Sequence, residues 1–399
     1  MPGGLSPQAI RETVTALAET KEILGRLIAF PTISSDSNLD LIRWCQNRLE
    51  GLGARIDLTH DAAGTKANLF ASFGPEGDGG VVLSGHTDVV PVEGQDWSTD
   101  PFQAVEQDGR IYGRGSCDMK GFIACALALA PRIAEADLRR PVHFALTYDE
   151  ETGCLGAQVL LQALRESGRR PGICIIGEPT SMRIIEGHKG CYEYTTRFSG
   201  LAGHSSAPHL GVSAVEYAVR YAAKLLELRG DLVNRAPEGS RFDPPETTLQ
   251  VGALRGGIAH NVIADQAEIE WEMRPVVEAD AEFVKREIGD YVGGTLLPAM
   301  KAVHGEASIE TQIIGEVAGF EPMDHSEACE LVAELTGSNA RELVSFGTEA
   351  GLFQRAGMSA VICGPGSIDQ AHKADEFVAV EQLEQCLTMI DRLIGTLSR

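Results

Sequence analysis

The chain has 399 residues, of which 43% are hydrophobic, 23% charged and 6% aromatic, and its formal net charge is −23. This composition is typical of a globular protein with one large or two moderate domains, and it excludes a fibrous or disordered chain. The acidic excess argues against a nucleic-acid surface, and no run reaches the roughly 18 apolar residues of a membrane helix, so neither partner is expected.

Helices alternate with short apolar strands over the first 180 residues. Apolar positions at helical spacing predict helices at 7–30, 38–52, 120–136 and 153–168. Short, nearly uninterrupted apolar runs predict strands at 81–85, 141–148 and 173–177. This order indicates an α/β fold with a parallel or mixed sheet flanked by helices on both faces.

The pattern changes at about residue 188. A βαββαβ order follows, with strands at 191–200, 247–256, 266–275 and 307–315 and helices at 211–230 and 278–294. This order predicts a ferredoxin-like α+β sandwich with its helices on one face. The first pattern then returns with a helix at 325–337, a strand at 359–366 and a helix at 380–397. We therefore expect residues 1–187 and 316–399 to form one domain, and 188–315 to form a second domain inserted into it.

The nine cysteines are scattered singly, without a C-x-x-C motif. An unpatterned, odd-numbered set in a large chain predicts reduced thiols and a cytoplasmic location. The first 30 residues contain acidic side chains and no continuous apolar run, which argues against a signal peptide.

The strand at 81–85 is followed by His86 and Asp88 in "LSGHTDVVPV". Alone, such a pair is more often a structural hydrogen bond than part of a site. Open α/β sheets, however, bind ligands beyond the carboxyl ends of their strands. Further acids and an imidazole lie after predicted strands, before a helix or on a loop: Asp118 in "GRGSCDMKGF", Glu150 and Glu151 in "TYDEETGC", Glu178 in "IIGEPTS" and His372 in "GPGSIDQAH". Together they predict a metal site.

Two imidazoles and three carboxylates suit zinc, and cobalt or manganese are alternatives. A carboxylate shared by two ions would give a two-metal site, which needs one further, unligated carboxylate as a proton acceptor. Glu150 and Glu151 can divide these roles, because consecutive side chains point in different directions.

With these motifs, and with "GHSSAPHLGVSAVE" (203–216), the chain resembles the M20 family of co-catalytic metallopeptidases and amidohydrolases from about residue 20 to 395. The resemblance implies a zinc-exopeptidase-like catalytic domain, two zinc ions per subunit with cobalt as an alternative, and an inserted lid that also forms a homodimer. It assigns one metal to His86 and Glu178, the other to Glu151 and His372, and the bridging position to Asp118.

The resemblance also implies roles around the metals. Glu150 matches the catalytic base, and the Asp88 carboxylate matches the group that orients the His86 ring. The peptide bond from Asp118 to Met119 is expected to be cis. His204 matches a lid residue that donates to the scissile carbonyl, usually in the partner subunit's site.

Four further residues are candidates for binding the substrate. Asn261 and Arg274 match lid positions that hold the substrate, the latter through an α-carboxylate. Thr348 and Glu349 match a loop on the substrate side. The alternatives are a turn residue at Asn261 and a surface charge at Arg274.

The resemblance finally implies a function. We expect hydrolysis of an N-acyl amino acid, first of all N2-acetyl-L-ornithine in arginine biosynthesis. A succinylated diaminopimelate, another N-acyl amino acid or a short peptide are alternatives, because small pocket changes alter selectivity by only about 1 to 3 kcal/mol. A non-catalytic binding protein on the same fold is disfavoured by the intact set of five ligands and a base.

Overall fold

The computed structural model describes the backbone of residues 7–398 and the side chains of residues 15–398. The chain divides into two compact units. The first unit consists of Met1–Gly187, Pro322–Glu342 and Thr348–Arg399, and the second consists of His188–Glu321 and Leu343–Gly347.

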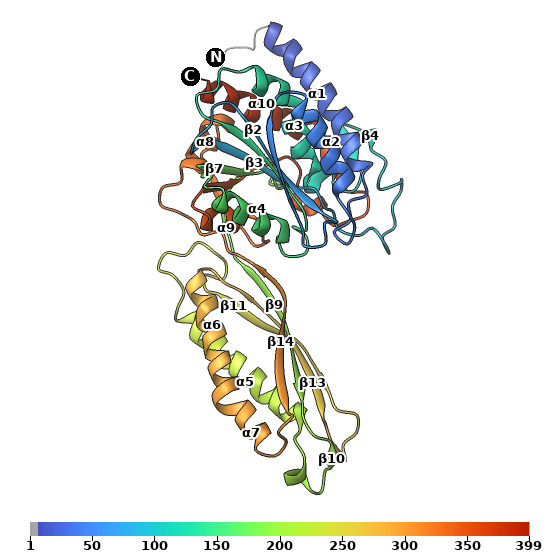
Figure 1. The fold of residues 1–399 in the computed structure, drawn as a ribbon, viewed down its shortest axis with the longest axis vertical. Coiled ribbons are helices and arrows are strands. Elements are labelled where there is room, and N and C mark those ends of the chain that lie inside the picture. Colours follow the sequence, from blue (N-terminus) through green and yellow to red (C-terminus); the bar gives the residue numbers. More distant parts are fainter. Residues whose placement is uncertain (1–6, 399) are drawn as a thin grey trace. The chain divides into compact units, whose positions relative to one another are not determined.

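A mixed sheet of eight strands forms the centre of the first unit, in the order β1-β2-β6-β3-β7-β16-β8-β15 (Figure 1). The strands are β1 (Arg55–His60), β2 (Ala67–Phe73), β3 (Val81–His86), β6 (Val142–Thr147), β7 (Ile173–Ile176), β8 (Ile184–His188), β15 (Arg341–Val344) and β16 (Ser359–Ile362). Strand β3 pairs in parallel with β6 and with β7, and β7 pairs in parallel with β16. The carboxyl ends of these four strands therefore meet at one edge of the sheet.

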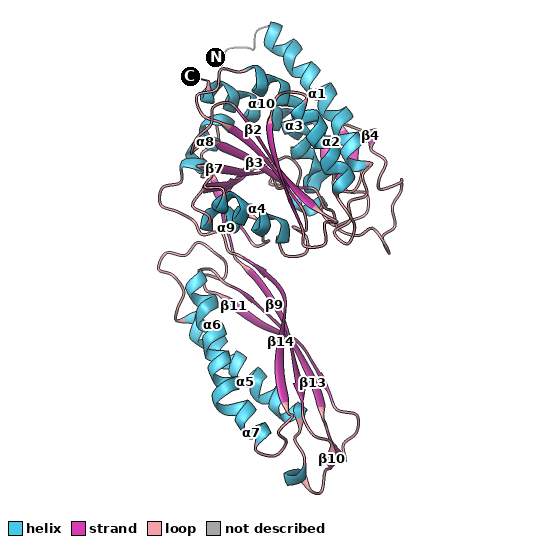
Figure 2. Cartoon of the chain, in the orientation of Figure 1, coloured by secondary structure: helices cyan, strands magenta, loops and turns pink. Residues whose placement is uncertain are grey.

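Helices cover both faces of this sheet (Figure 2). They are α1 (Pro7–Ile28), α2 (Leu39–Glu50), α3 (Gly121–Glu135), α4 (Leu155–Glu166), α8 (Glu327–Thr336), α9 (Ala350–Arg355) and α10 (Val380–Leu397). Side chains of α1, α2, α3, α8 and α10 share one apolar core with the sheet, whereas α4 and α9 lie on the other face. The predicted α/β architecture with a mixed sheet flanked by helices is confirmed.

A small sheet, in the order β17-β5-β4, is also part of the first unit. It consists of β4 (Val105–Gln107), β5 (Arg110–Tyr112) and β17 (Phe377–Ala379). Pairing of β17 with β5 joins the segment after His372 to the segment before Asp118. This pairing brings the segments that carry His372 and Asp118 side by side, although the two residues are far apart in the sequence.

The sequence predicts neither β1 nor β2. Every residue of β2 is buried, including the polar Asn68 and Ser72, which interrupt the apolar pattern. Asn68 donates to Thr59 Oγ1 and to the carbonyl oxygen of Gly156. Because these partners come from other elements, the local pattern gives no indication that this segment forms a buried strand.

The second unit contains a four-stranded antiparallel sheet in the order β11-β13-β9-β14. Its elements are β9 (Cys191–Ser199), β10 (Gly203–His204), α5 (Ala214–Val233), β11 (Thr248–Gly256), β12 (Val262–Ile263), β13 (Gln266–Arg274), α6 (Glu278–Tyr291), α7 (Leu297–Lys301) and β14 (Ser308–Val317). Both α5 and α6 pack on one face (Figure 1), where the rings of Tyr221 and Trp271 are buried. The observed order of strands and helices is βαββαβ, with the short β10, β12 and α7 added.

No helix in the described part of the chain has the length and apolar character required to cross a membrane. All nine cysteines are free thiols, and eight of them are buried.

Candidate metal centre

The carboxyl edge of the large sheet gathers most of the candidate ligands. His86 is the last residue of β3, and Glu150 and Glu151 follow β6. Glu178 lies two residues after the end of β7. Parallel pairing of β3 with both neighbours places these three strand ends together.

Asp118 lies between the two histidines. Its Oδ1 is 3.0 Å from His86 Nε2, and its Oδ2 is 3.4 Å from His372 Nε2. Asp118 belongs to the short turn η1 (Ser116–Lys120), directly before α3. The Asp118–Met119 peptide bond is cis, as the family resemblance implied.

Each histidine has a second carboxylate beside it. Glu151 Oε2 lies 3.1 Å from His372 Nε2, and Glu178 Oε1 lies 3.9 Å from His86 Nε2. The ligand atoms of His86, Asp118 and Glu151 all lie within 4.8 Å of one another. All five predicted ligands are therefore gathered around Asp118, and we call these five residues the ligand cluster.

The chemistry of the ligand cluster fits divalent cations. The Nδ1 atom of His86 lies 2.9 Å from the carbonyl oxygen of Asp88, so Nδ1 carries a proton and donates it. In a neutral imidazole, Nε2 then points a lone pair at the Asp118 carboxylate, and only a cation or a second proton between them makes that contact favourable. Glu178 Oε1 is buried without a hydrogen-bond partner among the described residues. It is a further acceptor that a cation would satisfy.

Electrostatics within the ligand cluster agrees with this interpretation. Burial raises the pKa of Glu178 well above its usual value, and nearby Asp118 raises it further. Burial would also raise the pKa of Asp118, but hydrogen bonds with His372 and His86 hold it below its usual value. Hydrogen bonds to Asp118 and Glu151 raise the pKa of His372 to about 10. The buried carboxylates thus require positive charge nearby, which metal ions can supply in place of protons.

Asp88 holds the acid pair in place. Its Oδ1 accepts from the backbone amide of Glu150 at 3.2 Å, and its Oδ2 accepts from the amide of Glu151 at 3.4 Å. Ser34 Oγ donates to the same carboxylate at 2.7 Å. Asp88 also positions His86, but through its backbone carbonyl, because its carboxylate oxygen is 3.6 Å from the ring nitrogen.

Glu376 is a residue that the sequence analysis missed. It is 1% exposed, and its carboxylate accepts from the backbone amides of Cys117 at 2.9 Å and Asp118 at 3.1 Å. Arg114, equally buried, donates to it at 2.8 Å. Glu376 therefore anchors the turn that carries Asp118. Its position four residues after His372 is the only signal that the sequence offers.

Thr348 and Glu349 are both buried in the first unit. Burial raises the pKa of Glu349 to about 7, against the opposing influence of the nearby Thr147 side chain. Its carboxyl group therefore faces the protein interior close to the end of β6, and Ala350, the next residue, begins α9.

The other candidates lie in the second unit. His204 is exposed, and its Nδ1 accepts from the backbone amide of Ser206 at 3.2 Å. This contact leaves the proton of the neutral ring on Nε2, which is then available as a donor. Asn261 is exposed in the loop before β12, and Arg274 ends β13 with its guanidinium paired to Glu272 at 2.9 Å.

Comparisons with known proteins agree on one family. Residues 82–396 match the model of peptidase family M20/M25/M40. The chain is 34% identical over 381 residues to the acetylornithine deacetylase of Pasteurella multocida (strain Pm70), covering 94% of this chain and 97% of that protein. It is 35% identical over 375 residues to the acetylornithine deacetylase of Edwardsiella ictaluri (strain 93-146), covering 92% of this chain and 95% of that protein.

A solved structure shares the fold over nearly the full length. The aminopeptidase PepT of Bacillus cereus ATCC 10987 superposes with a TM-score of 0.71 and 18% identity, covering 96% of this chain and 99% of that one. At this identity the likeness concerns the fold alone.

Proposed function

The chain belongs to peptidase family M20/M25/M40, and we propose that this hydrolase is a two-metal amidohydrolase that converts N2-acetyl-L-ornithine and water to acetate and L-ornithine. The observation that carries the chemistry is the position of Asp118, whose two carboxylate oxygens face two different imidazoles. The observation that favours this substrate is the identity of 34% and 35%, over most of the chain, to proteins named acetylornithine deacetylase.

We propose that the ligand cluster holds two zinc ions. His86 and Glu178 would bind one, Glu151 and His372 the other, and Asp118 both. When bound, the ions supply Lewis acidity toward water and the acyl carbonyl. Cobalt is the alternative metal, because the same imidazole and carboxylate set suits it.

Glu150 is the proposed base. It adjoins the ligand Glu151, and its backbone is fixed by Asp88. Glu150 takes a proton from the attacking water while a carbon–oxygen bond forms at the acyl carbon. It then gives that proton to the amine nitrogen as the carbon–nitrogen bond breaks, so one carboxyl group acts as base and then as acid.

Residues of the second unit are proposed to bind the substrate. The Nε2–H of His204 would donate to the acyl oxygen as negative charge develops there. Arg274 would exchange Glu272 for the substrate's α-carboxylate, which suits its two parallel donors. Asn261 is proposed to hold the substrate as well. Contacts of Thr348 and Glu349 with the substrate, and a cytoplasmic location, stay predictions.

A homodimer formed through the second unit is part of this proposal. Along α5, Val219, Leu226 and Val233 follow one another at intervals of seven residues and are 53%, 46% and 55% exposed. Such a row of exposed apolar residues on one helix supports a protein contact. In the dimer, His204 would act in the partner subunit's site.

A panel of substrates tests the assignment. Hydrolysis of N-acetylornithine, an N-succinylated diaminopimelate, N-acetylmethionine and a dipeptide is measured with added zinc or cobalt, with the Glu150→Ala variant as the control for contaminating activity. We expect the largest kcat/KM for N-acetylornithine. Turnover of the dipeptide alone would refute the deacetylase assignment and leave the peptidase alternative.

A further inference from the structure

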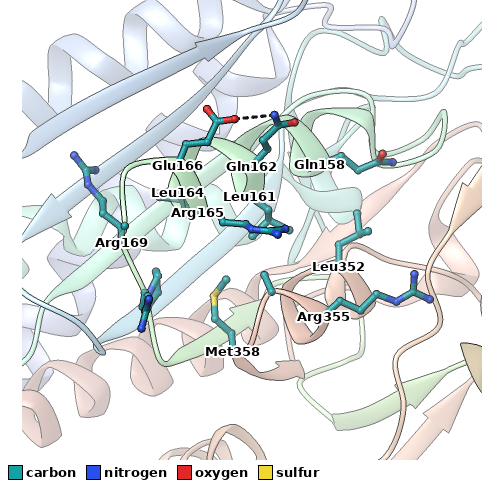
Figure 3. Close-up of a pocket in the computed structure, with 14 residues that line it drawn as sticks. Gln158, Leu161, Gln162, Leu164, Arg165, Glu166, Arg169, Leu352, Arg355 and Met358 are labelled. Carbon is teal, nitrogen blue, oxygen red and sulfur yellow. Dashed lines mark hydrogen bonds between the residues drawn. The ribbon is translucent and has the colours of Figure 1, made fainter.

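A pocket of about 860 Å³ lies in the first unit, beside the carboxyl-terminal halves of α4 and α9 (Figure 3). Four of its 14 lining residues are arginines, namely Arg165, Arg169, Arg170 and Arg355. In the whole chain, 57 acidic residues outnumber 34 basic ones. The pocket lining is therefore positively charged, whereas the protein as a whole is negatively charged. We call this feature the arginine pocket.

The lining contains little negative charge to balance these arginines. The one acidic residue of the lining, Glu166, accepts a hydrogen bond from Gln162 at 2.8 Å (Figure 3). Arg169 lies at the edge and pairs with Asp57. Arg165 and Arg170 are exposed, and neither guanidinium has a hydrogen-bond or ion-pair partner among residues 15–398. Two guanidinium groups of the lining are thus available to a ligand.

Part of the pocket lining is apolar. Leu164 and Met358 are buried, and Leu161 and Leu352 are half-buried. In Figure 3 the Arg165 side chain lies between α4 and the side of the pocket formed by Leu352 and Met358. A ligand there would contact apolar surface with one part and guanidinium groups with another.

We propose that the arginine pocket binds a small organic anion, with its apolar body on Leu161, Leu352 and Met358 and a phosphate or carboxylate group on Arg165 and Arg170. The guanidinium fork matches both anions, because each offers two oxygens to parallel donors. A nucleic acid does not fit, since the basic patch is confined to one pocket of a chain with a net charge of −23. This proposal is independent of the proposed hydrolytic reaction.

Direct binding to the metal-loaded full chain tests the proposal. Four probes are titrated by calorimetry at about 0.1 M salt, where contacts between distant surface charges are screened. ADP and inorganic pyrophosphate represent phosphates with and without an apolar body, and benzoate and acetate represent carboxylates in the same way. We expect saturable binding of ADP, benzoate or both, tighter than that of the matching small anion. The probe that binds identifies the anionic group.

Matched variants locate the binding. Arg165→Gln/Arg170→Gln should weaken it about tenfold or more, since two charge-assisted hydrogen bonds are lost. Arg43→Gln/Arg140→Gln removes the same charge from exposed ion pairs elsewhere in the first unit and should leave it nearly unchanged. Equal binding by the unmodified protein and both variants would place the anion elsewhere, for example at the metals, and would overturn the proposal. The absence of saturable binding by every probe would also overturn the proposal, and so would a result in which neither ADP nor benzoate binds more tightly than its small counterpart.

Discussion

The carboxylate of Asp88 accepts a hydrogen bond from the backbone amide of Glu150 at 3.2 Å, which ties the end of β3 to the turn after β6. The same carboxylate accepts from Glu151 and from Ser34. One side chain thus fixes the proposed base and one proposed ligand.

Replacing Asp88 by Asn should lower kcat about 10- to 100-fold and weaken metal binding, because a side-chain amide offers only one acceptor atom for these donors. Steady-state kinetics and metal titration measure both effects. Ser34→Ala removes one of the donors, and it should lower kcat and metal affinity clearly less than the Asp88 variant does. Equal losses in the two variants would contradict a central role for the Asp88 carboxylate.

The acid pair should separate into a base and a ligand. Glu150→Ala should keep its metal content and lose about 100- to 10,000-fold in kcat, whereas Glu151→Ala should lose metal from one site. Metal analysis of both purified variants, together with kinetics, decides between the roles. Loss of both ions from the Glu150 variant would reverse the assignment.

Glu376→Gln should destabilise the first unit by about 3 to 5 kcal/mol, because it leaves the Arg114 guanidinium buried without its counter-charge. Both side chains of this pair are 1% exposed. Denaturant unfolding measures the change. Asp40→Asn breaks the Arg43–Asp40 pair, whose side chains are 66% and 83% exposed, and should cost less than about 1 kcal/mol. A cost for Glu376→Gln no greater than that of the control would show that the buried pair contributes little.

His143 should make the fold less stable in acid. Burial lowers its pKa to about 4, while in the unfolded chain the pKa is about 6.5. Between these values the unfolded chain binds more protons, so the free energy of unfolding falls as the pH drops from 6.5 towards 4. At pH 5 this loss is on the order of 2 kcal/mol relative to pH 7.5.

His143→Gln should remove that part of the pH dependence, even though it costs stability at pH 7.5 through loss of the contacts with Ser72 and Phe70. Denaturant unfolding at pH 7.5 and pH 5 measures the difference for each protein. The exposed His60, changed to Gln, is the control and should behave like the unmodified chain. An unchanged pH dependence in His143→Gln would assign the acid sensitivity to other groups.

Subunit exchange tests the proposed action of His204. His204→Ala should lower kcat about 100- to 1,000-fold, since one donor to the developing oxyanion is lost. Mixing it with Glu150→Ala should restore part of the activity, because a mixed dimer would contain one site with both residues. If exchange is verified and activity does not return, His204 acts within its own subunit or has no role in the reaction.

The sequence by itself determined the alternation of helices and strands and the identity of the proposed ligands. The proposed ligands His86, Glu151 and Glu178 stand at or shortly after apolar runs that form parallel strands, and the local pattern locates such strand ends. The family resemblance in the sequence then assigns their roles. The local pattern also locates the βαββαβ segment, whose strands have clear boundaries in the sequence.

Only the tertiary structure decided how the site is supported. Glu376 reaches the Asp118 amide across 258 residues of sequence, and Ser34 reaches Asp88 across 54. The arginine pocket likewise combines Arg165 of α4 with Met358, after α9. Contacts of this kind leave no periodic trace in the chain, because they depend on how distant elements pack and not on the spacing of neighbouring residues.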